Sequence, residues 1–315
     1  MNPDLPSEAA EYGAGAARAF ASLGGLDAAR RAEVDPAERG RSVARALEAL
    51  GADQLDPRAD PDAAAAAGEL CRAAGRVMLP YPVVPLLLRT GGAPLAVVGE
   101  GRLRVDHGDL FDEWRVATVD GRAQAAKPAS SRLATKLGPF VVDLSPGGPQ
   151  AEPAHRDVAF HLTLSAWLVL GVIERAVELA VEHVSGRVQF GQALSSFQAV
   201  QFQLADAAVG VEGLRELCRF TLWRLFADPE RCQPDALAVR LHALETARTV
   251  LRTTQQLHGA AGLCDEYDIS ILCRHVQPCL RLPFGSERTA LELAGAVERM
   301  GFDSLFPHGA RSAVG

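Results

Sequence analysis

The feature that most constrains the fold is a run of mostly apolar residues from Leu162 to Val184. Apolar residues recur in it every three or four positions and cover most of the helix circumference, which predicts a helix buried on most sides. Glu174, Arg175 and Glu178 interrupt the run, so it does not fit a membrane span. A helix of this kind is stable only when other elements pack around it.

The chain that follows provides candidate partners for this helix. Helical patterns run over Phe197–Phe226, Asp235–His258 and Ser286–Met300, and segments containing proline or glycine separate them. Ser286 is the candidate N-cap of the last helix. Long helices joined by short breaks predict an antiparallel four-helix bundle.

Two other zones precede the bundle. Residues 1–89 are rich in alanine with helical spacing, which predicts an N-terminal helical domain whose last long helix starts at Asp60 or Asp62. Residues 90–150 hold short β-like runs separated by glycines, which predicts a reduced antiparallel β domain. Its expected strands are Leu95–Val98, Leu103–Val105, Trp114–Val119 and Phe140–Leu144. We therefore expect a mainly α fold with a small β domain, and a bundle domain over 151–315.

Composition excludes several classes of protein. The net charge of −7 argues against a nucleic-acid partner. The six cysteines include no C-x-x-C pair and no histidine pair has zinc-ligand spacing, so we expect free thiols and no metal site. The polar, acidic N-terminus does not fit a signal peptide. These features predict a cytoplasmic protein with no membrane partner.

Several motifs occur in a fixed order within the predicted bundle. They are R-V-Q-F-G at Arg187–Gly191, F-Q-A-V-Q at Phe197–Gln201, L-A-D at Leu204–Asp206 and Q-L-H-G-A-A-G at Gln256–Gly262. This set resembles the acyl-CoA dehydrogenase flavoprotein family, whose C-terminal domain carries an R-x-Q-F-G, an F-Q, an L-A-D and a Q-x-H-G-G-x-G segment. Gly75–Pro82 also resembles the end of that family's N-terminal helical domain.

The resemblance implies FAD as the cofactor. It also implies that these motifs reach across a dimer interface to the FAD that the neighbouring subunit mainly holds. The Arg187 guanidinium has forked donors that suit pyrophosphate oxygens, and Gly259 permits close backbone approach at a helix break. Phe190 and Phe197 fit core positions equally well. The candidate cofactor contacts are Arg187, Gln189, Phe190, Phe197, Gln256, Gly259, Ala260 and Ser286.

The sequence departs from the family at the catalytic base. The family's α,β-dehydrogenation of an acyl-CoA thioester uses a carboxylate, usually Glu, to remove the α proton while the β hydride passes to the flavin. The two positions that carry this Glu correspond here to Phe284 and to a position near His161. No catalytic residue is therefore assigned. His161 is one substitute because its ordinary pKa suits proton transfer, and Asp157 is a second, although Asp157 also suits a helix N-cap.

The β zone departs as well, because the family's segments that hold the flavin ring and the thioester are not found there. The chain thus lacks what a subunit gives to its own site and keeps what it gives to its neighbour. That pattern indicates the base-lacking, FAD-binding subunit of a heteromeric acyl-CoA dehydrogenase, similar to the α2β2 two-gene enzymes of actinobacterial steroid side-chain degradation. The related partner subunit would hold most of the acyl-CoA, and electron-transfer flavoprotein is the acceptor that the family implies.

Two alternatives stay open. One is a self-sufficient, divergent dehydrogenase or oxidase that uses His161 or Asp157 as its base. The other is a degenerate structural or regulatory protein that keeps the fold and binds no flavin. Flavin content and activity of the purified chain distinguish the three possibilities.

Overall fold

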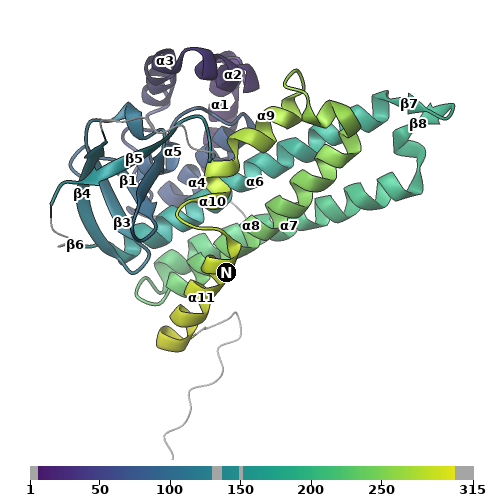
Figure 1. The fold of residues 1–315 in the computed structure, drawn as a ribbon. Coiled ribbons are helices and arrows are strands. Elements are labelled where there is room, and N and C mark those ends of the chain that lie inside the picture. The colour runs from purple at the N-terminus through teal and green to yellow at the C-terminus, as the bar shows by residue number, and fades with distance from the viewer. Residues whose placement is uncertain (1–5, 130–136, 149–151, 302–315) are drawn as a thin grey trace, which may run out of the picture.

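The computed structural model describes residues 6–129, 137–148 and 152–301. Along the chain it contains a group of N-terminal helices, a six-stranded sheet and a set of long helices. Figure 1 shows the sheet at one end of the molecule, with the long helices running away from it to a small hairpin at the opposite end. The mainly α fold with a small β domain is confirmed. The expected boundary at 150–151 lies outside the described residues.

The N-terminal helices follow the predicted pattern closely. They are α1 (Ser7–Ser22), α2 (Leu26–Val34), α3 (Pro36–Ala49), α4 (Pro61–Arg76) and the short α5 (Val83–Leu87). The N-cap of α4 is Asp60, whose carboxylate accepts a hydrogen bond from the backbone N–H of Ala63 at 2.8 Å. Pro61 occupies the first helical position, where its missing N–H costs nothing.

The sheet differs from the predicted antiparallel unit. Its strands are β1 (Leu95–Val98), β2 (Leu103–Asp106), β3 (Trp114–Thr118), β4 (Arg122–Pro128), β5 (Val141–Pro146) and β6 (Glu152–Pro153). The order is β1-β3-β4-β5-β2, with β6 paired to β4, and β1 runs parallel to β3. The sheet is therefore mixed, and the expectation of an antiparallel unit is wrong. Strand β4 was not expected, because its alanines, glutamine and lysine have low strand propensity and pairing with β3 and β5 overrides it.

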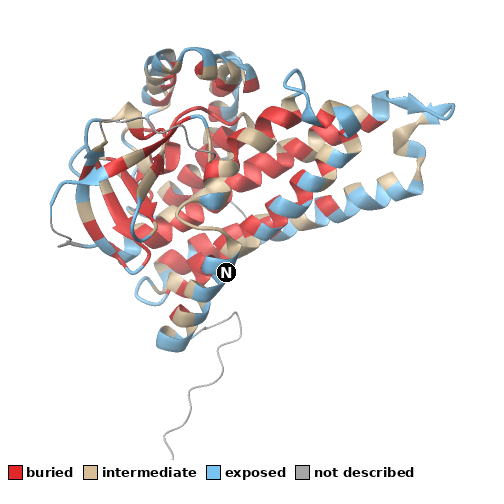
Figure 2. Cartoon of the chain, viewed as in Figure 1, coloured by how far each residue is buried: buried red, intermediate tan, exposed pale blue. Residues whose placement is uncertain are grey.

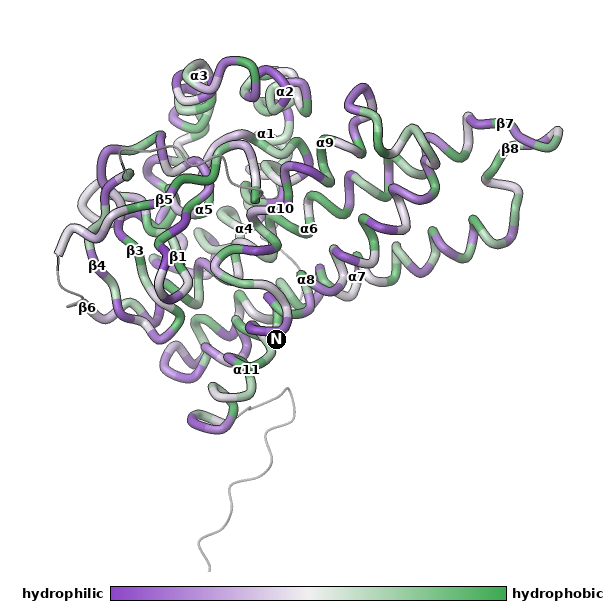
Figure 3. Tube along the Cα trace, in the orientation of Figure 1, coloured by the Kyte–Doolittle hydropathy of each residue, from purple (hydrophilic) through white to green (hydrophobic). Residues whose placement is uncertain are grey.

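The long helices are built around α6 (His155–Gly186), which packs against α4, α7 (Gln198–Ala227) and α8 (Gln233–His258). Helix α11 (Ser286–Met300) packs on α8. The remaining elements are β7 (Val188–Gln189), β8 (Gln192–Ala193), α9 (Asp268–His275), α10 (Gln277–Arg281) and the 3₁₀ turns η1 (Gly108–Leu110), η2 (Leu194–Ser196) and η3 (Gly259–Leu263). Figure 2 shows α6 buried along most of its length, and Figure 3 shows mixed hydropathy along α7. The predicted buried helix is thus confirmed.

A buried charge cluster links three of these helices. Glu174 of α6, whose side chain is 5% exposed, pairs with Arg72 and Arg76 of α4 and with Arg215 of α7 at 2.8, 3.2 and 2.9 Å. A buried carboxylate is stable only when its charge is matched in this way. Across the described ranges, no helix is both long and apolar enough to cross a membrane.

Candidate functional site

The R-V-Q-F-G motif forms a hairpin at the far end of the bundle. Helix α6 ends at Gly186, Arg187 follows in extended backbone, and β7 pairs with β8 across a two-residue loop of Phe190 and Gly191. Both loop residues have positive φ, +53° and +81°, which is normal for Gly191 and uncommon for an aromatic residue. Phe190 is nevertheless 91% exposed. The local turn therefore presents an aromatic ring at the tip of the hairpin, which Figure 2 shows as an exposed segment.

The Q-L-H-G-A-A-G motif forms a tight turn at the end of α8. Gly259 has φ +61° and ψ −138°, a conformation that glycine adopts readily, and it ends the helix. Gly262 closes the turn, because a Cβ there would lie 2.5 Å from the Gln255 carbonyl oxygen. The Gln255 amide donates to the Gly262 carbonyl at 2.9 Å. Gln256 is left exposed on the last turn of α8.

A stacked pair of histidines joins the R-V-Q-F-G hairpin to the Q-L-H-G-A-A-G turn. The ring of His183, in the last turn of α6, stacks on the ring of His258, the last residue of α8, with centroids 4.5 Å apart and planes 25° apart. Arg187 lies one turn after His183, and its backbone N–H donates to the His183 carbonyl at 2.9 Å. Burial, His258 and Arg187 lower the pKa of His183, so this ring is neutral at neutral pH.

The other candidate contacts divide into two groups. Phe197 packs edge-to-face on Phe190 with centroids 6.3 Å apart, so it belongs to the hairpin end of the bundle. Ser286 lies at the opposite end, where α11 begins (Figure 1). It is the first residue of α11 rather than the predicted N-cap, because Gly285 precedes the helix and no side chain caps it. Arg187 makes no ion pair with any residue that the structure describes.

His161 lines a separate cavity of about 100 Å³ between the N-terminal helices, the sheet and α6. Its Nδ1 has no hydrogen-bond partner among the residues that the structure describes, and burial together with the nearby Arg240 lowers the pKa of His161 to about 3. An imidazole with so low a pKa is a weak proton acceptor. The apolar lining of the cavity includes Met78, Tyr81, Val84, Ala96, Val105 and Leu168.

The same cavity contains a carboxyl group that sequence reasoning missed. Asp106, the last residue of β2, lines it, and burial raises the pKa of Asp106 to about 7. Its carboxylate accepts a hydrogen bond from the backbone N–H of His107 at 3.1 Å. No local pattern marks Asp106, because only strand pairing brings the end of β2 beside α6.

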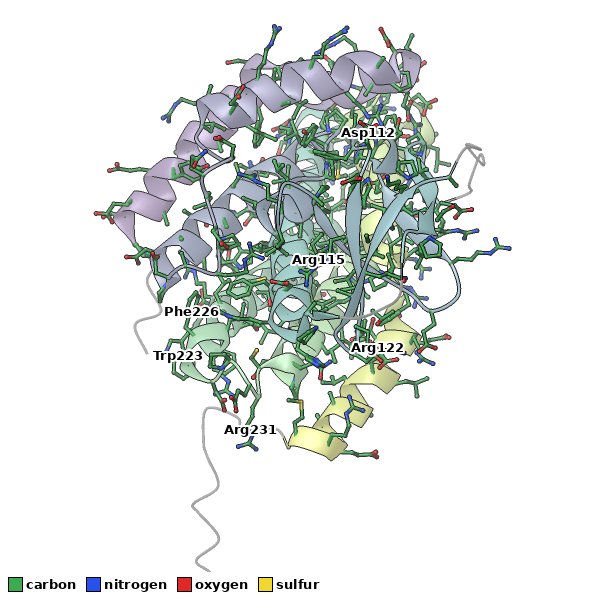
Figure 4. All side chains as sticks on the ribbon, turned by 90° about the vertical axis from the view of Figure 1, so that its left-hand side faces the viewer. Asp112, Arg115, Arg122, Trp223, Phe226 and Arg231 are labelled. Atoms are coloured by element: carbon green, nitrogen blue, oxygen red, sulfur yellow. The ribbon has the colours of Figure 1, made fainter. Side chains whose placement is uncertain are left out.

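Asp157 holds α6 in place instead of facing this cavity. It is the third residue of α6, so it is not the N-cap, which is Ala154. One oxygen accepts from Arg58 at 3.0 Å and the other from Arg115 of β3 at 2.7 Å. Figure 4 labels Arg115, which lies where the sheet meets α6.

Phe284, at the family's other base position, lies in the loop before α11. The Arg240 guanidinium, which is buried, donates to the carbonyls of Leu282 and Phe284 at 2.7 and 2.9 Å and so fixes this loop. The end of β1 lies against the same loop, because a Cβ on Gly99 would be 2.9 Å from the Pro283 carbonyl oxygen. The end of β1 and the loop before α11 are thus in backbone contact at this point, and beside it they line a pocket together with Thr118 and Glu292.

Part of the sequence and almost the whole fold match those of known proteins. Residues 163–297 match the family model for the acyl-CoA dehydrogenase C-terminal domain. The acyl-CoA dehydrogenase FadE27 of Mycobacterium tuberculosis is 28% identical over 242 residues, which are 67% of this chain and 62% of that protein. The chain thus aligns with less than two thirds of this curated relative.

Solved structures extend the likeness to almost the whole chain. The Tcur3481-Tcur3483 steroid ACAD G363A variant has a TM-score of 0.76 at 21% identity and covers 94% of this chain and 99% of that chain. The ChsE4-ChsE5 complex of Mycobacterium tuberculosis has a TM-score of 0.76 at 18% identity and covers 95% and 99%. A glutaryl-CoA dehydrogenase from Mycobacterium smegmatis in complex with FADH2 has a TM-score of 0.67 at 16% identity and covers 95% and 97%. The chain therefore has the acyl-CoA dehydrogenase fold, and its residues 163–297 match the model of that family's C-terminal domain.

Proposed function

We propose that this chain is the base-lacking, FAD-binding subunit of a heteromeric acyl-CoA dehydrogenase, an enzyme that introduces an α,β double bond into acyl-CoA thioesters. One observation carries the proposal: the two cofactor motifs are held together at an exposed end of the bundle, while both family base positions lack a carboxylate. Steroid side-chain CoA esters are the substrate class we favour, because two heteromeric or steroid-linked structures share this fold.

The hairpin end of the bundle suits a dinucleotide supplied by a partner chain. The Arg187 guanidinium is exposed and would pair with pyrophosphate oxygens, and Gln256 would hydrogen-bond to the cofactor. Phe190 offers an apolar ring face, and Gly259 has no atom within 4 Å of a Cβ position, which leaves room at the turn. When bound, FAD supplies the acceptor for the substrate hydride. This chain's residues bind and orient it.

The exposed apolar side chains near the hairpin support association with a second, related chain. Exposed apolar side chains lie on β7, in the hairpin loop and on the first half of α7: Val188, Phe190, Phe202 and Val209 are 62%, 91%, 60% and 72% exposed. Grouped exposed side chains of this size are typical of a protein–protein interface. We place the partner's FAD at this surface, in an α2β2 assembly with the acyl-CoA held mainly by the partner and electron-transfer flavoprotein as acceptor.

The flavin content of the complex that this chain forms tests the proposed role. We expect the complex with a related chain that has a complete β domain and a base Glu to be yellow and to contain half as many FAD molecules as chains. Arg187→Ala and Gln256→Ala should lower FAD content, whereas Arg122→Ala in the sheet (labelled in Figure 4) should not. A stable homomer with full flavin occupancy and dehydrogenase activity contradicts the proposal. Unchanged FAD content in Arg187→Ala favours a protein that binds no flavin.

Asp106 favours a second candidate function, a self-sufficient dehydrogenase. A carboxyl with a pKa of about 7 in a mostly apolar cavity is suited to proton transfer, which His161 and Asp157 are not. Under this alternative, the purified chain would bind FAD and oxidise an acyl-CoA alone. Asp106→Asn would then abolish turnover while flavin stays bound. An inactive wild-type homomer excludes this candidate.

A further inference from the structure

The stacked pair of His183 and His258 lies beside both motifs, with His183 just before R-V-Q-F-G and His258 inside Q-L-H-G-A-A-G. His183 is four residues before Arg187, and His258 lies between Gln256 and Gly259. The contact between the two rings joins the C-terminal ends of α6 and α8. Any change in this contact therefore alters how the hairpin sits relative to the turn.

The hydrogen bond that His258 makes shows which of its ring nitrogens carries a proton. The Nδ1 of His258 lies 2.7 Å from the Thr254 carbonyl oxygen. A carbonyl only accepts, so Nδ1 carries a proton and donates. The Thr254 hydroxyl donates in turn to the Val250 carbonyl at 2.9 Å. His258 is thus anchored to the body of α8, and Thr254 is fully buried.

The electrostatics of the pair suit a stacked arrangement. His183 is half-buried between His258 and Arg187, both of which lower its pKa together with burial. The face-to-face geometry of two rings 4.5 Å apart is favourable when His183 carries no charge beside the Arg187 cation. The ring of His183 thus acts as a flat, uncharged spacer between α8 and the start of the hairpin.

We propose that His183 and His258 are positioning residues that set the spacing between Arg187 and the Gln256–Gly259 turn, and so determine how tightly the chain binds the partner's FAD. They act through Arg187 and Gln256 without contacting the cofactor. The inference rests on the proposed function. A binding site keeps its affinity only when packing locks its contact residues in place, and here the stacked rings provide that packing.

The test compares FAD affinity in complexes that carry variants of this chain. We expect His183→Ala and His258→Ala each to raise the dissociation constant for FAD about tenfold. His183→Phe keeps a flat ring and should restore affinity to within about threefold of the wild type. His242→Ala, on the same helix as His258 and with a long hydrogen bond to Thr246 at 3.5 Å, is the matched control and should bind FAD normally.

A second measurement on the chain without FAD separates this inference from the proposed function. The ring C–H resonances of His183 in NMR spectra should shift when His258 is replaced by Ala and stay unchanged in His242→Ala. If Arg187→Ala also binds FAD normally, the proposed function fails. If Arg187→Ala loses FAD while both histidine variants keep wild-type affinity, or if His183→Phe fails to rescue, the positioning role alone is overturned.

Discussion

The backbone of α6 at Gly171 lies directly against the carbonyl oxygen of Arg72 in α4. A Cβ on Gly171 would be 1.9 Å from that oxygen, and a Cβ on Gly75 of α4 would be 2.0 Å from the Leu168 carbonyl oxygen. The two helices therefore cross with their backbones in contact, and this requires glycine at position 75 in α4 and at position 171 in α6. This crossing sets the position of α6, which leads into the R-V-Q-F-G hairpin and whose Leu168 lines the cavity.

Gly171→Ala should destabilise the protein by about 3 kcal/mol, since the added methyl group can be accommodated only if α4 and α6 move apart. Urea or thermal unfolding measures this loss. Gly186→Ala is the matched control at the end of the same helix, where a Cβ meets no atom within 4 Å. Equal stability of the two variants would contradict the close crossing.

Glu174→Ala should destabilise the protein by about 3–5 kcal/mol, because it leaves three arginines around a buried site without their shared carboxylate. Glu212 also pairs with Arg215 but is 61% exposed. Glu212→Ala should therefore cost about 1 kcal/mol or less. Denaturant unfolding of both variants checks the difference, and a cost for Glu174→Ala as small as that of Glu212→Ala would show that the cluster is dispensable.

Gly259→Ala should destabilise the end of α8 by about 1–3 kcal/mol, because its φ of +61° and ψ of −138° disfavour any residue with a Cβ. The loss is purely conformational, since a Cβ there meets no neighbouring atom. Hydrogen exchange at the C-terminal turn of α8 provides the measurement. Gly285→Ala, with φ −80° and the same open surroundings, should show normal exchange.

The Asp106 carboxyl should contribute stability that is lost as pH rises from about 4 to about 7, whereas the lowered pKa of His161 acts in the opposite sense over most of this range. Burial raises the pKa of this carboxyl from 3.8 to about 7, so the folded chain holds a proton that the unfolded chain has released across this window. The contribution is fully present below the unfolded pKa and is lost as pH passes the folded pKa, with a slope of at most about 1.4 kcal/mol per pH unit.

Asp106→Asn removes this dependence while keeping an oxygen that accepts from the His107 backbone N–H. His161, whose lowered pKa acts in the opposite sense, remains in both proteins. The change in unfolding free energy from pH 5 to pH 7.5 should therefore be more positive in Asp106→Asn than in the wild type. An identical pH dependence in both proteins would show that Asp106 is ionised and solvated in the folded state.

Local sequence alone determined most of the helical fold. The periodic apolar residues of 162–184 lead to a buried helix, and proline or glycine marks the ends of the other long helices, because these preferences act within one or two turns. The order of the motifs likewise indicated the family. Asp60 caps α4 and Pro61 occupies its first position. Sequence patterns predict such a helix start well, because the capping hydrogen bond joins residues only three positions apart.

Only the tertiary structure decided how distant groups meet. Parallel pairing of β1 with β3 brings together segments that no local rule joins. Asp157, expected as a helix cap or a base, instead pairs with Arg58, 99 residues away, and with Arg115. The stacking of His183 on His258 and the entry of Asp106 into the cavity have the same origin. Each depends on packing between segments remote in the chain, whose free energy comes from burial and charge pairing rather than from backbone preference.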